Sequence, residues 1–286
     1  MNSLCDGTLP AIVRQIARGA SIEITPNETA RISSLPSLLA PGTRVFLTHI
    51  SGASIESSIT AAARLKSQGM KPVVHIAARR LRSREELQNL AEALRKVGCC
   101  EALIIAGSDR NPIGSFASSL DLLDTGVLER AGFDRIGVAG HPEGNPDVSD
   151  DLLWTALQQK NEYAKSSTAR FHIVTQFCFD SQAVIRWERA ARERGNLLPV
   201  HIGIPGLTSV SKLLKFAALC GVGASVRFLR GGSRGMLRLP RWQPDEFIAS
   251  IARSRRGDNA SLIDNLHFFP FGSICETVDF IHGILS

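Results

Sequence analysis

Short apolar runs recur along the chain, and longer stretches with helical periodicity separate them. The runs are nearly continuous in apolar and β-branched residues, which is typical of strands buried on both faces. Eight such runs span residues 21–26, 44–50, 71–77, 101–107, 135–140, 171–177, 199–204 and 265–269. Each is short enough for a strand, so the pattern predicts eight strands.

The stretches between these runs have the spacing and the end signals of helices. They cover residues 55–68, 83–97, 118–130, 149–165, 181–194, 208–219, 244–255 and 273–284. Ser83 and Glu86 have the spacing of a capping box, and Ser51 or Ser54 can cap the first helix. Helix-ending glycines follow four of the stretches, at Gly69, Gly98, Gly132 and Gly195.

Strand and helix alternate through all 286 residues. Eight strands alternating with about eight helices predict a single α/β domain over residues 1–286, a (β/α)8 TIM barrel. A doubly wound open sheet is the alternative. No linker, low-complexity run or repeat indicates a second domain, and residues 230–241 are expected to form a loop at the barrel rim.

Composition favours a globular protein with an anionic partner. Hydrophobic residues make up 44% and charged residues 21%, which argues against disorder, and the net charge is +6. Nucleic acid, a flavin pyrophosphate or a folate glutamate tail would each suit that charge. Six cysteines without C-x-x-C or metal-finger spacing are typical of small buried thiols in a reducing compartment. With no signal peptide and no apolar run of ~18 residues, we expect a cytoplasmic protein without a membrane partner.

In a barrel of this kind the active site lies at the carboxyl ends of the strands. Those ends carry acids, an amide, hydroxyls and glycines, but no cluster with metal-ligand spacing. The sequence also has no G-x-S-x-G turn and no P-loop. Serine-triad hydrolysis and phosphoryl transfer are therefore poorly supported, and no metal is expected.

Glu23 is the most informative single position. It lies in the first strand between Ile22 and Ile24, so it should point into the barrel while they point outward. A carboxylate buried there costs several kcal/mol unless it is paired or protonated. Burial tends to raise a carboxyl pKa towards the range in which it can donate a proton. A structural glutamate satisfied by an arginine is the alternative.

Several segments resemble, in order, the motifs of methylenetetrahydrofolate reductases. Ser21–Pro26 is similar to their first-strand S-F-E-F-x-P, and Val138–Asp147 to V-A-x-Y-P-x-x-H-P-E. Val174–Asp180 is similar to I-T-Q-x-F-F-D. Shorter matches are His75-Ile-Ala to P-H-x-T, Ile202–Gly206 to I-x-P-G-I, and His267-Phe-Phe to H-F-Y-T. The chain thus resembles a divergent member of that family, whose fold is an eightfold barrel.

The resemblance implies an oxidoreductase acting on CH–NH donors, which interconverts 5,10-methylenetetrahydrofolate and 5-methyltetrahydrofolate. Hydride passes through bound FAD, and NAD(P)H is the implied electron partner. Glu23 would be the proton donor, and Gln176 would bind the pterin. Asp109 would act beside the flavin and the pterin, and Phe228 would supply an aromatic wall for the substrate.

The same resemblance implies a set of flavin-contacting residues. These are Thr48, His75, Gly107, Ser108, Asp109, Phe116, Ala117, His141, Asn145, Asp151 and Lys160. Lys160 could neutralise phosphate. The alternative for such helix residues is an ordinary solvated surface. A homo-oligomer is also expected.

The sequence departs from the family pattern at several positions. Ala106 replaces the arginine of R-G-D, His141 the tyrosine of Y-P, and Asn145 the histidine of H-P-E. Flavin could therefore be absent, with direct transfer from nicotinamide, or the nicotinamide site could be altered, as would suit oxidation of 5-methyltetrahydrofolate. A non-redox pterin enzyme such as a methyltransferase also stays open. A nucleic-acid-binding protein is disfavoured, because only 6% of residues are aromatic and they do not interleave with the arginine clusters.

Overall fold

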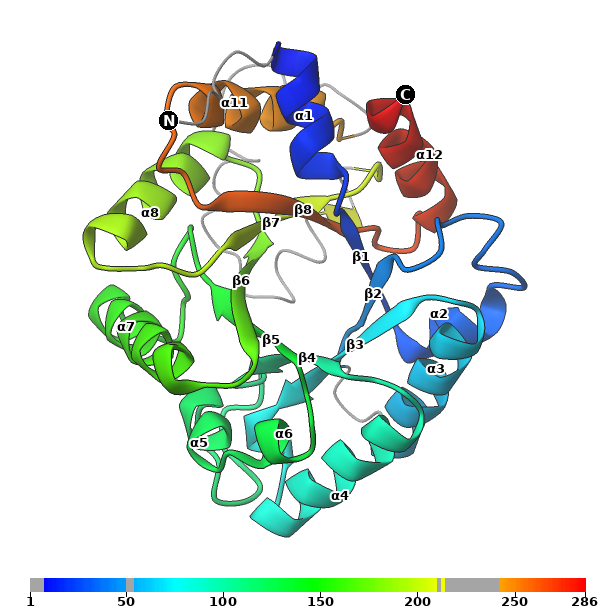
Figure 1. Cartoon of the computed structure of the whole chain (residues 1–286), viewed down its shortest axis with the longest axis vertical. Coiled ribbons are helices and arrows are strands. Elements are labelled where there is room, and N and C mark those ends of the chain that lie inside the picture. The colour runs from blue at the N-terminus through cyan, green and yellow to red at the C-terminus, as the bar shows by residue number, and fades with distance from the viewer. Residues whose placement is uncertain (1–7, 50–53, 210–211, 214–241) are drawn as a thin grey trace. The chain divides into compact units, whose positions relative to one another are not determined.

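The eight predicted strands form one closed, parallel barrel in the order β1 to β8, which confirms the (β/α)8 fold (Figure 1). The computed structural model describes residues 8–49, 54–209, 212–213 and 242–286. The strands are β1 (Ser21–Ile24), β2 (Arg44–Leu47), β3 (Lys71–Ala77), β4 (Glu101–Ile105), β5 (Arg135–Gly140), β6 (Arg170–Phe177), β7 (Val200–Pro205) and β8 (Ile263–Phe269). Each predicted strand is present, with ends that differ by three residues at most.

The helices lie outside the strands (Figure 1). They are α1 (Leu9–Ala17), α2 (Pro26–Arg31), α3 (Ile55–Ser67), η1 (Ala78–Arg80), α4 (Arg84–Lys96), α5 (Ser119–Asp124), α6 (Val127–Arg130), α7 (Asp150–Ser166), α8 (Ser181–Glu193), α11 (Asp245–Arg256) and α12 (Ile274–Leu285). The helix expected over residues 208–219 lies largely outside the described residues.

Three helix predictions were wrong or incomplete. The expected helix over residues 118–130 is divided into α5 and α6, because Gly126 has a φ of +60° and breaks the helical path. We did not predict α2, although Thr25 and Glu28 form a reciprocal capping box with Pro26 at the first helical position. Nor did we predict α1, which buries Ile16 and Ala17.

The caps were only partly predicted. Ser54 caps α3, and Ser83 accepts a hydrogen bond from the backbone N–H of Glu86 at the start of α4. Glu86 does not return this bond to Ser83; its carboxylate accepts from the backbone N–H of Arg82. The four predicted helix-ending glycines all have positive φ, as a left-handed terminus requires.

The elements group into two compact units. The first, here the β2–β5 unit, comprises Ile22–Ala139 and Gln158–Val174. Its interior includes a buried cluster of Phe46, Val73, Leu103 and Val174. Phe46 and Val73 are register partners on β2 and β3, so this layer crosses neighbouring strands as barrel-core layers do.

The second, here the β7–β8 unit, comprises Met1–Ser21, Gly140–Leu157 and Thr175–Ser286 as far as they are described. In it α1 packs between α11 and α12 and against β8 (Figure 1).

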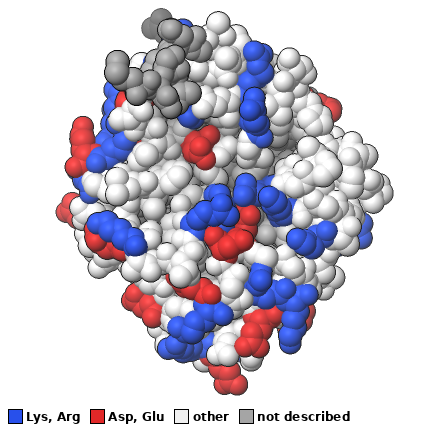
Figure 2. All heavy atoms as spheres, in the orientation of Figure 1, with Lys and Arg blue, Asp and Glu red and all other residues white. Residues whose placement is uncertain are grey.

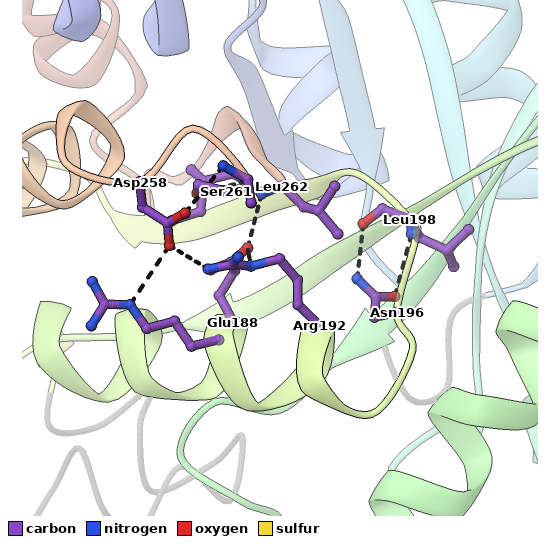
Figure 3. A network of polar contacts seen from close by, with 10 residues as sticks. Glu188, Arg192, Asn196, Leu198, Asp258, Ser261 and Leu262 are labelled. Atoms are coloured by element: carbon purple, nitrogen blue, oxygen red, sulfur yellow. Dashed lines mark hydrogen bonds and ion pairs between the residues drawn. The ribbon is translucent and has the colours of Figure 1, made fainter. Parts of the chain in front are cut away.

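A polar network joins α8 to the segment before β8 (Figure 3). Glu188, which is 2% exposed, accepts from the backbone N–H of Leu262 at 2.8 Å and lies 2.8 Å from Arg192 Nε. Arg192 also pairs with Asp258. The buried carboxylate is thus compensated by a guanidinium and a backbone donor.

The cysteine prediction holds for only part of the described chain. Cys99 and Cys178 are buried, but Cys100 is half-buried and Cys275 is exposed, so the expectation of uniformly buried thiols was wrong. Among the described helices, none is long and apolar enough to cross a membrane.

Candidate active site

Glu23 faces a histidine in the β2–β5 unit. Its Oε2 lies 3.3 Å from Nε2 of His75, two strands away, and the two side chains are 13% and 7% exposed. The atoms are close enough for an ion pair but are not aligned as a hydrogen bond. Glu23 is the register partner of Phe46, which belongs to the buried core cluster, so Glu23 points inward as predicted and lies beside a histidine.

The ring of His75 is fixed by aromatic packing. It meets the buried ring of Phe46 edge-on, with centroids 6.0 Å apart and planes at 81°. The pair adjoins the apolar cluster, because Phe46 is the register partner of Glu23 and Leu103 is that of His75. The pair lies near the carboxyl ends of β1 and β3, where a barrel places its chemistry.

Asp109 follows β4 in a loop that approaches β3 closely. Gly107 has a φ of +94°, and a Cβ there would lie 3.3 Å from the Cβ of Ala77, so the turn requires glycine. The Asp109 carboxylate is partly buried, and its Oδ2 lies 3.2 Å from Nε of Arg80. A negative charge is thus present at the end of β4, but it is paired.

The remaining candidates of this unit differ in burial. Thr48 directly follows β2, is half-buried and donates its backbone N–H to Ile24 O at 3.0 Å. Phe116 is buried, whereas Ser108 and Ala117 are exposed. The Ala117 backbone is nevertheless fixed, since its N–H donates to Asp121 Oδ2 at 2.7 Å.

Lys160 is a buried cation in the second half of α7. It is only 6% exposed, and burial lowers its pKa to about 8. No carboxylate contributes to that shift among the described groups, in contrast to Lys165 on the same helix, which pairs with Glu162 at 2.6 Å. A buried ammonium without an opposite charge fits an anionic ligand such as phosphate.

The other candidates lie in the β7–β8 unit. Gln176, next to the end of β6, donates from Nε2 to Gly144 O at 3.3 Å, and so rests on the loop after β5. The Asn145 side chain accepts from Asp147 N at 2.9 Å, which fixes a turn in that loop. His141 is half-buried in the same loop, whereas Asp151 is exposed at the start of α7. Phe228 lies outside the described residues.

An aromatic group at the ends of β6 and β8 was not predicted. The ring centroid of Phe177 lies 5.1 Å from that of Phe271 and 5.6 Å from that of Phe269. Among the described non-glycine residues, Phe271 alone has positive φ, at +49°. Backbone strain of this kind is concentrated at binding and active sites. The sequence offered one sign of it, the run Phe268-Phe269-Pro270-Phe271-Gly272.

His49, Arg79, Arg80 and Glu143 were also missed as parts of the site. Three of them surround Asp109, as described below, and Glu143 accepts from the backbone N–H of Phe179 at 3.4 Å. The sequence does not show that η1 turns Arg80 towards the end of β4. In the described residues no group of three or more histidines, cysteines or acids is placed to hold a metal ion.

Comparison with known proteins now decides the family. The sequence profile of methylenetetrahydrofolate reductase matches residues 29–229, which is more than half of the chain. The chain belongs to the methylenetetrahydrofolate reductase family. Methylenetetrahydrofolate reductase (NADH) 1 of Arabidopsis thaliana is 24% identical over 214 residues. These are 71% of this chain but 32% of the relative, so the chain spans about a third of that relative's length.

Solved structures agree on the fold alone. A protein from Burkholderia cenocepacia J2315, provisionally named a phosphonomutase, superimposes with a TM-score of 0.53 over 97% of each chain, at 9% identity. Within this methylenetetrahydrofolate reductase family member, the profile match contains Thr48, Lys160 and Gln176 but begins after Glu23. The assignment of Glu23 therefore depends on its place in the barrel and its contact with His75.

Proposed function

We propose that this chain interconverts 5,10-methylenetetrahydrofolate and 5-methyltetrahydrofolate by hydride transfer with bound FAD. The proposal is supported by family membership and by one decisive observation, the inward-facing Glu23–His75 pair at the strand ends. NADH is the first electron partner to test, because the Arabidopsis relative is named for it.

Glu23 handles the proton that this reaction requires. In the reducing direction a proton must reach a ring nitrogen of the folate, so that the imidazolidine C–N bond breaks and the one-carbon unit becomes able to accept hydride. Glu23 donates that proton, and in the oxidising direction it accepts it. His75 lies 3.3 Å away and can exchange a proton with Glu23 between turnovers.

The described residues fit FAD. Bound FAD supplies the two-electron acceptor and donor for the hydride. Lys160 holds the phosphate. Its ammonium is buried, and burial alone lowers its pKa to about 8, so a bound phosphate would supply the opposite charge that the ammonium lacks among the described groups. The glycine turn at Gly107 lets backbone approach a planar ligand closely. Phe116 lies in the same loop after β4, and Thr48 follows β2.

Gln176 and the aromatic group serve the folate. Gln176 presents an amide, which can both donate to and accept from a pterin edge. Phe177, Phe269 and Phe271 offer aromatic faces suited to a flat heterocycle, in the role that we first gave to Phe228.

We further propose that oxidation of 5-methyltetrahydrofolate is the favoured direction. The replacements at Ala106, His141 and Asn145 alter positions that the family pattern keeps near the flavin and nicotinamide. Altered nicotinamide binding would leave the folate half-reaction as the main source of electrons.

The test is the visible spectrum of the purified protein after loading with FAD. We expect bands at roughly 370 and 450 nm, bleached by 5-methyltetrahydrofolate under anaerobic conditions. Bleaching by NADH alone, with rapid reduction of methylenetetrahydrofolate, would reverse the proposed direction. Glu23→Gln should keep the flavin bands but lose bleaching by folate.

Two other results would replace the proposal. A colourless protein that takes up no FAD, yet binds folate, would indicate direct nicotinamide transfer or a non-redox pterin enzyme. Salt-sensitive binding of nucleic acid without flavin would indicate a basic binding protein. The face shown in Figure 2 does not favour nucleic-acid binding, since basic and acidic side chains lie there in adjacent small groups.

A further inference from the structure

The short helix η1 fixes the loop that follows β4. The backbone N–H of Arg79 donates to Ala106 O at 3.0 Å, and Arg79 O accepts from Ile113 N at 2.9 Å. Its side chain donates from Nε to Ala117 O and from Nη1 to Asp109 O, both at 2.9 Å. Both ends of the loop are therefore anchored on one residue, and Asp109 lies between the anchors.

Arg80, the next residue, turns towards the Asp109 side chain. Its Nε donates a hydrogen bond to Nε2 of His49 at 3.3 Å and lies 3.2 Å from Asp109 Oδ2. Arg80 and Asp109 have one-quarter-exposed side chains, 25% and 27%. Three strand ends thus contribute one side chain each to a compact group, His49 after β2, Arg80 after β3 and Asp109 after β4.

His49 must be neutral for this arrangement. An imidazole nitrogen that carries a proton cannot accept the Arg80 hydrogen bond. Burial, then the charges of Arg80 and His75, lower the pKa of His49 below its usual 6.5, and Asp109 opposes this shift. Glu23 faces His75 from the other side, at 3.3 Å.

We propose that Arg80 is a positioning residue for Asp109, and that neutral His49 holds Arg80 in place. The guanidinium fixes the carboxylate at the end of β4 and neutralises it there. The family's R-G-D motif has an arginine two residues before its acid, whereas this chain has Ala106 in place of that arginine and its acid, Asp109, one position later. Here the cation comes from a different strand. The functional consequence rests on the proposed function, in which Asp109 lies beside the flavin.

The first test uses the protein without flavin. Histidine ring signals are followed by NMR over pH 4–8, with His49→Gln to assign the His49 signal. Arg80→Gln should raise the proton affinity of His49 by roughly threefold to tenfold, since a neighbouring cation is removed. Asp109→Asn should lower it, and this effect should be at least halved in the Arg80→Gln background, because Asp109 is no longer held near His49.

Arg84→Gln is the matched control. Arg84 lies four residues away and donates to Thr125 O at 2.9 Å, so its replacement changes the net charge without touching the group. Equal shifts of His49 in Arg80→Gln and Arg84→Gln would overturn the proposal. So would an Asp109→Asn effect of the same size in both backgrounds.

The second test is the redox equilibrium of bound flavin. At a fixed potential, Arg80→Gln should raise the ratio of oxidised to reduced flavin about threefold to tenfold, because an uncompensated carboxylate disfavours the reduced, more anionic form. Arg80→Lys should restore most of the wild-type ratio. An unchanged ratio in Arg80→Gln would contradict the role at the flavin. If wild-type protein takes up no FAD, the proposed function fails, whereas the His49 titrations still decide whether Arg80 positions Asp109.

Discussion

Glu23 and Glu101 are equally buried carboxylates in the β2–β5 unit, but Glu23 lies beside a histidine and Glu101 between two arginines. Their side chains are 13% and 12% exposed. Glu101, the first residue of β4, lies 2.6 Å from Arg44 Nε and 3.9 Å from Arg135 Nε. Glu23, near the end of β1, lies 3.3 Å from a histidine nitrogen.

The partner decides what each carboxylate can do. A guanidinium keeps its charge at any physiological pH, so Glu101 between two arginines is a fixed ion cluster. An imidazole nitrogen, unlike a guanidinium, can either donate or accept a proton, so His75 can exchange one with Glu23. The Glu101 cluster lies at the amino ends of the strands, where residues of a barrel contribute to stability. The Glu23–His75 pair lies near the carboxyl ends, where barrels have their active sites.

Replacing Glu23 should give the largest effect. Glu23→Gln keeps the size of the side chain and removes the acid, so turnover with folate should fall by about 10²–10⁴. Thermal unfolding and FAD uptake should change little, because glutamine keeps the shape of the side chain and can still hydrogen-bond. Stopped-flow measurement of flavin bleaching checks this, and a variant that keeps more than a tenth of wild-type turnover would remove Glu23 from the mechanism.

Glu101→Gln is the reciprocal change and should alter stability instead. It leaves Arg44 and Arg135 without their carboxylate, at a cost of about 2–3 kcal/mol. This is below the loss for a fully buried pair, since both arginines are about one-fifth exposed (21% and 20%). Urea unfolding measures the loss. Activity per folded molecule should stay near wild type; a drop as large as that of Glu23→Gln would show that burial, not the partner, makes the difference.

The fold could be predicted from the sequence because β3 and β5 are long apolar runs that match the predicted bounds. The errors lie at residues whose local signal has two possible meanings. Gly126 interrupts a stretch that is otherwise helical, and Pro26 was taken as the end of a strand although it also begins α2. A glycine can lie within a helix or break it, and a proline can end a strand or begin a helix. In both cases the first meaning was chosen and the second was correct.

The sequence predicted which side chains each strand presents to the site, but not which of them lie in contact with one another. The inward direction of Glu23 follows from strand alternation, which is a local property. That His75 faces it depends on the stagger across two strands, which a single sequence does not contain. The turn of Arg80 towards Asp109 depends on η1, a three-residue helix too short to leave a periodic pattern.

Lys160 extends the comparison to a buried charge with no carboxylate partner among the described groups. Lys160→Met should weaken FAD binding about tenfold, whereas Lys165→Met, an exposed lysine of the same helix, should not. Without flavin, Lys160→Met should be more stable than wild type by about 1–2 kcal/mol at pH 7, because the native state no longer buries an ammonium. Calorimetry of both variants, with and without FAD, measures the two effects.

The pH dependence follows from the same lysine. Burial lowers the pKa of Lys160 from 10.5 to about 8, so the unfolded chain binds more protons between these values. Flavin-free wild-type protein should therefore gain stability as pH rises from about 8 to 10.5, and its affinity for FAD should fall over the same range. Neither trend should appear in Lys160→Met. A wild-type affinity for FAD that stays flat above pH 8 would exclude a phosphate contact.

Asp264 tests whether a histidine partner matters by itself or only near the carboxyl ends of the strands. Its replacement should have the smallest effect. Like Glu23 it faces a histidine, since its Oδ2 lies 3.6 Å from His201 Nε2, but it lies at the start of β8 and is 52% exposed. The nearby His201 side chain holds the pKa of Asp264 below its usual 3.8, so its contribution to stability is present above about pH 4 and is lost as pH falls through the lowered value. Asp264→Asn should therefore cost under about 1 kcal/mol at pH 7 and nothing near pH 2, with folate turnover unchanged. If Asp264→Asn lowered turnover, a carboxylate–histidine pair would matter wherever the pair lies in the barrel. If turnover is unchanged, the Glu23–His75 pair matters because it lies near the carboxyl ends of the strands.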